Sequence, residues 1–240
     1  MRYFDAHVIA LGQLPNSLPN QLSGVIFFGP DALIQRRECS LVSPERLWGH
    51  ASSLNTFTEP ADEKFTALER TVIDLQLPDT ELLSRLQAPV SEWWPLAGTA
   101  RGARRFLHLT LPAGAAPAAS LRRIIKSYPR TVFMIDPFRH GPVPGWQAQI
   151  RLAEFDNVRL TTIGIVPGAT CRWAEAEKVS DALYFTVGEA GAGKILFASG
   201  LFWGYALDPS IWLDGIHVLN PDQKSLILEH NARELFDNLT

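Results

Sequence analysis

Short apolar runs recur along the chain, and stretches with helical periodicity separate them. Such runs, when apolar throughout and bounded by proline or glycine, are typical of strands that are covered on both faces, as in a parallel sheet. The run 24–29 shows this character most clearly, and the eight strand candidates are 2–10, 24–29, 45–54, 71–77, 104–111, 130–136, 157–166 and 194–199. The order of strands and helices is therefore the strongest constraint on the fold.

The stretches between these runs predict helices. One of them places Leu121, Ile124, Ile125 and Tyr128 at the i, i+3, i+4, i+7 spacing of an amphipathic helix. The last helix begins at Asn-Pro-Asp (220–222), which is a cap, a proline at the first helical position and an acid in the first turn. The predicted helices cover 62–70, 78–86, 118–128, 145–155, 172–185 and about 220–236.

Strands that alternate with helices imply parallel pairing with the helices outside. At roughly 30 residues per unit, the chain predicts an α/β fold, a (β/α)8 TIM barrel in a single compact domain over residues 1–240, with a doubly wound sheet as the alternative. In a barrel the active face lies at the carboxyl ends of the strands. That face would hold His7, Ile9, 27–30, 50–53, Asp74, His108, 136–140, Thr162, Ser199 and Gly200.

The charge and the cysteine content bear on the partners and the compartment of the protein. The net charge is −3, from 22 basic and 25 acidic residues, which predicts neither a nucleic-acid nor a membrane partner. Cys39 and Cys171 lie far apart with no CxxC spacing, as expected for free thiols in a reducing compartment. No signal peptide is evident, and the longest apolar runs are too short to span a bilayer. We therefore expect a cytoplasmic protein.

Four segments carry a resemblance to a known family: FDAHVI (4–9), YPRTVFMIDPFRHG (128–141), KILFASGLF (194–202) and LILEHNARELF (226–236). In order and spacing they resemble the amidohydrolase-related family of the amidohydrolase superfamily. The branch is the one that includes aminocarboxymuconate-semialdehyde decarboxylase and 2-pyrone-4,6-dicarboxylate lactonase. The resemblance covers the whole chain and implies a hydrolase of lactones or amides, or a decarboxylase, built on a TIM barrel.

The resemblance also implies a metal site, and this chain departs from it. The family holds its metal with two histidines of the first strand, histidines of strands five and six, and an aspartate of strand eight. Position by position, His7 is kept, the second histidine is Ile9, and His108 could be the strand-five ligand. Pro137 and Gly200 stand at the strand-six histidine and the strand-eight aspartate. The expected metal site is therefore degraded, and no cofactor is predicted.

One alternative keeps a single divalent metal such as zinc on His7 and His108, with Asp136 or His140 as the third ligand, since a catalytic zinc typically has three protein ligands. The loss of the aspartate at position 200 removes the group that would handle the proton of an attacking water. General base catalysis needs a titratable group within reach of that proton. Ser199 alone serves this purpose poorly.

The candidate catalytic residues are His7, His108, Asp136 and His140. Arg139 is a candidate for binding an anionic substrate group, because a guanidinium presents a fork to a carboxylate, and Ser199 is a second substrate-binding candidate. Each residue also has a structural interpretation. The histidines could be hydrogen-bonded core groups, Asp136 could cap a loop, and the two residues after Phe138 could be an exposed loop.

Two function hypotheses follow. The first is a hydrolase or decarboxylase that acts on a small organic molecule, with a carboxylate as the favoured class, at a degraded or absent metal site. The alternative is a non-catalytic barrel, a pseudoenzyme that binds a small ligand or a partner subunit. The resemblance leaves a homodimer open. A nucleotide-binding loop is disfavoured, because GEAGAGKI (188–195) lacks the final hydroxyl residue and precedes a strand.

Overall fold

The computed structural model describes residues 2–9, 22–28, 47–54, 71–75, 77–97, 105–166, 173, 176–202, 212–213 and 215–237. Each of the eight predicted strand segments carries a strand, and one further short strand, β9, follows the eighth outside the predicted ranges. The strands are β1 (Tyr3–Ile9), β2 (Leu22–Phe28), β3 (Leu47–Leu54), β4 (Thr71–Leu75), β5 (Arg105–Leu109), β6 (Thr131–Ile135), β7 (Val158–Thr161), β8 (Ile195–Leu196) and β9 (Leu201–Phe202).

The strands form one parallel sheet in the order β8-β7-β6-β5-β4-β3-β2-β1-β9. The two strands at the ends of this order, β8 and β9, are separated in the chain only by Phe197–Gly200. Within that segment Phe197 accepts a hydrogen bond of 2.9 Å from the backbone N–H of Ala6 in β1. The sheet therefore returns on itself. The (β/α)8 prediction is confirmed, and the alternative of a doubly wound sheet is wrong.

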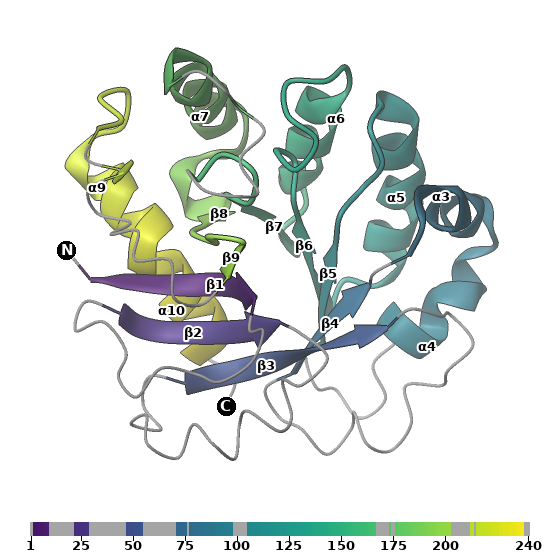
Figure 1. The fold of residues 1–240 in the computed structure, drawn as a ribbon. Helices are drawn as coiled ribbons and strands as arrows, with labels where there is room; N and C mark the ends of the chain where they lie inside the picture. Colours follow the sequence, from purple (N-terminus) through teal and green to yellow (C-terminus); the bar gives the residue numbers. More distant parts are fainter. Residues whose placement is uncertain are drawn as a thin grey trace.

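The described helices are α3 (Asp79–Gln87), η2 (Val90–Trp93), α4 (Trp94–Ala97), α5 (Ala115–Ser127), α6 (Trp146–Ile150), η3 (Arg151–Glu154), α7 (Ala176–Ala190), η4 (Ala192–Lys194), α9 (Pro221–Ser225), η5 (Leu226–His230) and α10 (Asn231–Asp237). Figure 1 shows the described helices on the outside of the sheet, with α3 to α7 alongside β4 to β8 and with α9 and α10 beside β1. The helix predicted at 62–70 lies outside the described residues. The other predicted helices are present, with ends that differ by a few residues.

Alternate strand residues pack into two separate cores, because successive side chains of a strand point to opposite faces. On β4, Ile73 and Leu75 pack outward in the core beneath the helices, whereas Val72 belongs to the core inside the barrel. The same division recurs on β5, where Phe106 is inside and Leu107 outside. Polar residues at the inner positions of these strands therefore point into the barrel.

The C-terminal helix closes the barrel at the amino ends of the strands. Phe236 of α10 stacks on Phe4 with ring centroids 5.5 Å apart and lies 5.1 Å from the ring of Phe106. The predicted cap at the start of this helix is confirmed: the Asn220 side chain accepts from the Gln223 N–H, and the Gln223 side chain accepts from the Asn220 N–H. Opposite this closure, the carboxyl ends of the strands form the other mouth of the barrel.

A π-helical turn, η5, interrupts the C-terminal helix and ties it to the last strand. The side-chain amide of Asn231, directly after η5, donates to the carbonyls of Ala192 (2.7 Å) and Ile195 (2.8 Å). Wider helical turns of this kind leave backbone groups available for other partners. Here the carbonyl of Ile227 accepts the N–H of Phe197 at 2.9 Å.

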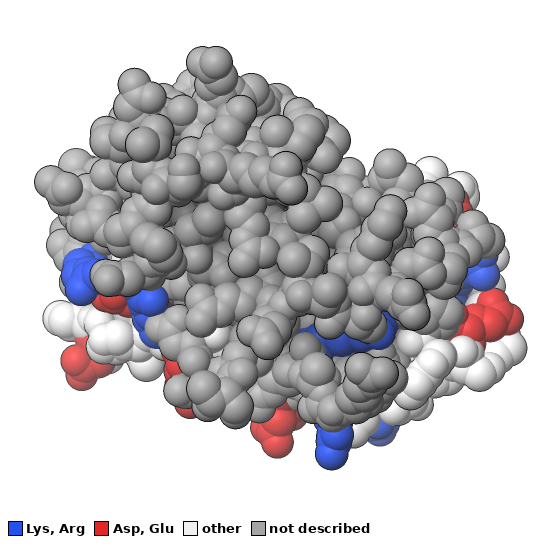
Figure 2. Space-filling model, turned by 90° about the horizontal axis from the view of Figure 1, so that it is seen from below, with Lys and Arg blue, Asp and Glu red and all other residues white. Residues whose placement is uncertain are grey.

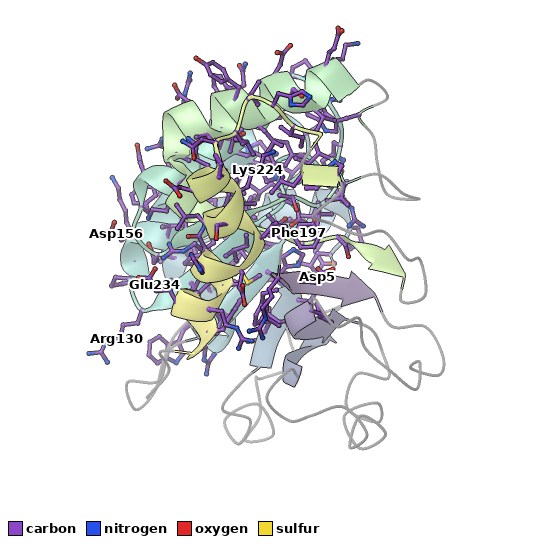
Figure 3. The ribbon with its side chains drawn as sticks, turned by 90° about the vertical axis from the view of Figure 1, so that its left-hand side faces the viewer. Asp5, Arg130, Asp156, Phe197, Lys224 and Glu234 are labelled. Carbon is purple, nitrogen blue, oxygen red and sulfur yellow. The ribbon has the colours of Figure 1, made fainter. Side chains whose placement is uncertain are left out.

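The segment between β8 and β9 is held by three different elements. Three consecutive backbone N–H groups donate at 2.9 Å each: Phe197 to the Ile227 carbonyl, Ala198 to Thr162 Oγ1 after β7, and Ser199 to Asp5 Oδ1 in β1. Figure 3 shows Asp5 and Phe197 close together, whereas Arg130, Asp156 and Glu234 lie at the periphery. Asp5 therefore has a structural role in holding this segment.

The described surface carries mixed charge. On the face in Figure 2, basic and acidic side chains of the described residues are interspersed along the edge. Ion pairs link neighbouring elements on the outside, among them Arg122 with Glu154 and Arg151 with Glu189. Within the described ranges, no helix has both the length and the apolar character that a membrane span requires.

Candidate functional site

Polar residues stand at the carboxyl ends of four neighbouring strands, at the mouth of the barrel. Asp74 is the penultimate residue of β4, and His108 is the penultimate residue of β5. Asp136 directly follows β6, and Thr161 is the last residue of β7. These ends meet at one edge because the strands are parallel and adjacent. The sheet therefore brings two carboxylates, an imidazole and a hydroxyl together.

His108 lies between the two carboxylates. Its Nδ1 is 2.7 Å from Asp74 Oδ1, and its Nε2 is 2.8 Å from Asp136 Oδ1. The side chains are almost fully buried, with 3% of His108, 5% of Asp74 and none of Asp136 exposed. Buried charged groups persist in proteins when they are paired and hydrogen-bonded, and this group satisfies both conditions.

Asp136 has hydrogen-bond partners in three other side chains. Besides His108, its Oδ2 accepts from Thr110 Oγ1 at 2.9 Å, and its Oδ1 accepts from Thr161 Oγ1 at 2.5 Å. Hydrogen bonds donated to a carboxylate favour its ionised form. The three donors come from the ends of β5 and β7, the strands on either side of β6, so the position of Asp136 is fixed by the sheet rather than by its own loop.

The environment changes the proton affinity of His108. Burial alone lowers the pKa of the imidazole, since it disfavours the charged form. The charge and hydrogen bond of Asp136, followed by those of Asp74, outweigh burial and raise the pKa of His108 from 6.5 to about 10. A titratable group perturbed by a specific charge partner at the mouth of a barrel is a candidate for function.

The turn after Asp136 is firmly seated. The Phe138 carbonyl accepts from the Gly141 N–H at 3.0 Å and from Trp173 Nε1 at 3.0 Å. His140 donates through Nε2 to the Leu111 carbonyl at 3.0 Å, which fastens the turn to the segment after β5. Gly164, at φ +97°, approaches so closely that a Cβ atom would lie 2.5 Å from the Phe138 oxygen. The turn therefore has little freedom to move.

Arg139 lies at the tip of this turn, half-buried. Its backbone N–H donates to the Asp136 carbonyl at 3.4 Å. The guanidinium has no ion pair within the part of the chain that the structure describes. A rigid turn that carries a charged fork is suited to hold a carboxylate.

Among the predicted site residues whose side chains the structure describes, a side-chain hydrogen bond joins His108 and Asp136. His140 is directed to a backbone carbonyl instead, and Ser199 is held through its backbone N–H by Asp5. His7 lies in β1, but its side chain is outside the described part, so its role stays a prediction.

The sequence places Asp74 on this face of the barrel without giving it a role, and it does not single out Thr110 or Thr161. The signal that could have found Asp74 is its inner position two residues after Val72. What the sequence does not contain is the register that pairs Asp74 with His108.

The donor set around His108 does not fit the metal position implied by the resemblance. A histidine ligand needs a lone pair on one ring nitrogen, and both nitrogens of His108 face carboxylate oxygens at hydrogen-bond distance. Pro137 and Gly200 offer no side-chain donor. Among the side chains that the structure describes, no group of three or more His, Cys, Asp or Glu is arranged to hold a metal ion.

No protein-family model and no curated protein matches the sequence. Solved structures do match over nearly the whole chain. An amidohydrolase from Burkholderia multivorans with bound zinc aligns with a TM-score of 0.65 and 13% identity, covering 99% of each chain. An Acinetobacter baumannii protein with bound citric acid, named as a 2-pyrone-4,6-dicarboxylic acid hydrolase, aligns with a TM-score of 0.58 and 15% identity, covering 99% of this chain and 100% of its own.

A 2,6-dihydroxybenzoate decarboxylase from Rhizobium aligns with a TM-score of 0.56 and 14% identity, covering 98% of each chain. Identities this low show the fold and not the reaction. The chain therefore has the α/β barrel fold that these amidohydrolase, hydrolase and decarboxylase structures share.

Proposed function

We propose that the chain is an amidohydrolase-like enzyme that hydrolyses a lactone or an amide, or removes a carboxyl group, on a small organic carboxylate without a bound divalent metal. The observation that carries the proposal is the Asp74–His108–Asp136 group at the carboxyl ends of the strands. Active sites of barrels of this kind lie at that end. A structural core of the same size would be served by apolar residues.

The substrate class is supported by two independent features. One is Arg139, a half-buried residue on the firmly seated turn that follows Asp136. The other is the nature of the structural neighbours, of which one is named for a dihydroxybenzoate and another contains citric acid. Both molecules carry carboxylates, the group that an arginine fork binds best.

Substrate binding and proton transfer would fall to different residues. Arg139 orients the substrate through its carboxylate, and Ser199 is retained as a second substrate-binding residue. Asp136 and His108 are the pair that exchanges protons with the reacting molecule, because both titrate and share a hydrogen bond. His7 and His140 remain candidate catalytic residues on the evidence of the sequence.

One observation favours the alternative of a non-catalytic barrel. Both nitrogens of His108 and both oxygens of Asp136 already have partners within the protein. A polar network that only stabilises a fold also has its hydrogen-bond donors and acceptors paired within the protein. Under this alternative the same mouth binds a small carboxylate or a partner subunit without chemistry.

Turnover assays separate these cases. The protein is purified, its metal content is measured, and it is tested with 2-pyrone-4,6-dicarboxylate, simple lactones and amides, and dihydroxybenzoates, with and without a chelator. We expect turnover of a carboxylate substrate that a chelator leaves unchanged and that Asp136→Asn abolishes. The exposed Asp181→Asn is the matched control. Stoichiometric zinc or manganese with chelator-sensitive turnover would contradict a metal-free mechanism, and saturable binding without turnover would support the alternative.

We also propose a cytoplasmic protein that forms one domain over residues 1–240 and assembles as a homodimer. The two widely spaced cysteines and the resemblance support these points. Sedimentation velocity of the purified protein tests the dimer. A single species with the mass of one chain would contradict it.

A further inference from the structure

We infer that Asp74 is a positioning residue that keeps His108 as an imidazolium between two carboxylates. The protonated ring of His108 is then a cation, at a position where the resemblance places a neutral metal ligand. The inference deepens the proposed function, because it concerns the same site. Its central claim, the protonation state of His108, can be measured without a substrate.

The charge of a histidine ring sets the number of protons that it can donate. A neutral imidazole has one N–H and one lone pair, so it donates to a single acceptor, and only the imidazolium donates from both nitrogens. His108 has a carboxylate oxygen at 2.7 Å from Nδ1 and another at 2.8 Å from Nε2. A lone pair that faced a carboxylate at this distance would be repelled in a buried site. With both carboxylates ionised, the geometry therefore calls for both N–H groups.

Asp74 supplies the second of the two acceptors, and the sheet fixes it there. Asp74 and His108 are Cα partners in the β4–β5 ladder, so their separation is set by strand pairing and not by a loop. Asp136 has two further donors, Thr110 and Thr161, which hold it whether or not His108 is charged. Asp74 is thus the residue whose removal would allow the ring to become neutral.

The neighbours of His108 agree with a charged ring. Among the described residues, the titratable groups hydrogen-bonded to it are Asp74 from β4 and Asp136 after β6, and both are acidic. The other described polar neighbours of the group, the hydroxyls of Thr110 and Thr161, are neutral. Two acidic partners in a buried site favour the cation, because opposite charges attract strongly where water is excluded.

This arrangement has a consequence for the chemistry. A bound metal would need a lone pair of the imidazole, and a proton occupies that position instead. The proton keeps one positive charge beside Asp136 without coordination of water. A barrel of this kind would work by proton exchange and carboxylate binding, which matches the proposed function.

The test is nitrogen NMR of the histidine rings in uniformly 15N-labelled protein. The chain contains six histidines, and the signals of His108 are identified by their loss in His108→Gln. We expect both ring nitrogens of His108 to show the shifts of protonated nitrogens at pH 7.5 and to remain so up to about pH 9. A single protonated nitrogen at pH 7.5 in the wild-type protein would overturn the inference, with no variant required.

Variants separate the role of Asp74 from a general effect of acidic residues. Asp74→Asn retains an oxygen that accepts from Nδ1–H but removes the charge, so we expect the titration of His108 to move down by about 1–3 pH units. Asp181→Asn, on the exposed face of α7, is the matched control and should leave the titration unchanged. An unchanged titration in Asp74→Asn would contradict the positioning role.

The last part of the test is the addition of zinc to the labelled protein. One equivalent of zinc added at pH 7.5 should leave both ring signals of His108 in place. A shift of either nitrogen to the range of a metal ligand, with release of protons, would overturn the inference. A protein that shows the imidazolium but turns over no carboxylate would refute the proposed function and leave the inference intact, so the two failures are distinguishable.

Discussion

Asp74 and His108 are direct partners across the β4–β5 ladder, and Asp74 Oδ1 lies 2.7 Å from His108 Nδ1. A pair formed by two strands of the barrel belongs to the scaffold of the protein. Its energetics should therefore appear in the stability of the fold as well as in any activity. Unfolding experiments and activity assays therefore both test this pair.

The stability of the protein should fall in alkaline solution because of His108. Its pKa is raised from 6.5 to about 10 in the folded state, so folding favours the protonated ring. This contribution is fully present below pH 6.5 and is lost as the pH rises through about 10. Urea unfolding at several pH values measures this loss. The free energy of unfolding of the wild-type protein should exceed that of His108→Gln at low pH, and this difference should shrink by a few kcal/mol as the pH rises. His217→Gln, at an exposed position, is the matched control.

Removal of the charge of Asp136 should destabilise the fold strongly. Asp136→Asn leaves the buried His108 with one charged partner instead of two, and the loss of one member of a buried ion pair costs about 3–5 kcal/mol. Chemical denaturation at pH 7 measures the change. Asp181→Asn should stay within about 0.5 kcal/mol of the wild type. Equal effects of the two variants would show that the buried group contributes no net stability.

The hydroxyl of Thr161 should matter more than its methyl group. Thr161→Val keeps the shape but removes the 2.5 Å hydrogen bond to Asp136, which we expect to cost about 1–3 kcal/mol in the free energy of unfolding. Thr161→Ser keeps the hydroxyl and should cost about 1 kcal/mol, the value of one buried methyl. The reverse order in denaturation experiments would mean that packing, not hydrogen bonding, dominates at this position.

Gly164 should not tolerate a side chain. Alanine there would adopt φ +97° and place its Cβ 2.5 Å from the Phe138 carbonyl oxygen, so we expect a loss of more than about 2 kcal/mol and a disturbed turn. The matched variant is Gly188→Ala in α7, where a Cβ meets nothing within 4 Å. That variant should be neutral or stabilising by up to about 1 kcal/mol, since alanine favours helix. Thermal denaturation compares the two.

Arg139 should affect substrate binding without affecting stability. With a carboxylate substrate in hand, Arg139→Ala should raise KM about 10-fold or more, and Arg139→Lys should restore little, because an ammonium lacks the bidentate fork. The exposed Arg130→Ala, on another surface, should leave KM unchanged. An unchanged KM in Arg139→Ala, with normal folding, would remove this residue from the substrate site.

The sequence predicted the strands well because both cores demand apolar residues along their whole length. It failed where buried residues are not in strands. The run predicted as strand to residue 166 ends at Thr161, because Thr162 bonds to the Ala198 backbone and the chain turns at Gly164. Ile165 and Val166 are buried within that turn, so apolar character alone does not distinguish them from a strand.

Helix ends were less predictable than helices. The helix predicted from residue 118 begins at Ala115, since Pro117 fits the first turn, where its missing N–H is not needed. The helix predicted to end at residue 185 continues to Ala190 through Gly188. Glycines suggest a turn there, but the turn begins only at Gly191, at φ +80°.

The candidate site was predictable in location but not in connectivity. The rule that barrels use the carboxyl ends of their strands selects His108 and Asp136 from the sequence. The identity of their partners depends on strand register and on side-chain direction, which no short motif encodes. The resemblance suggested that His108 is a metal ligand, whereas its neighbours Asp74 and Asp136 engage both ring nitrogens.

The bond between the Phe197 N–H and the Ile227 carbonyl bears on how this protein is made. The segment between β8 and β9 obtains one of its backbone partners from η5, which is translated later. Until η5 has left the ribosome, the strands β1 to β9 have been made, but the backbone of this segment is incompletely paired. Full pairing around the closure of the cylinder is thus a late event that awaits the synthesis of η5.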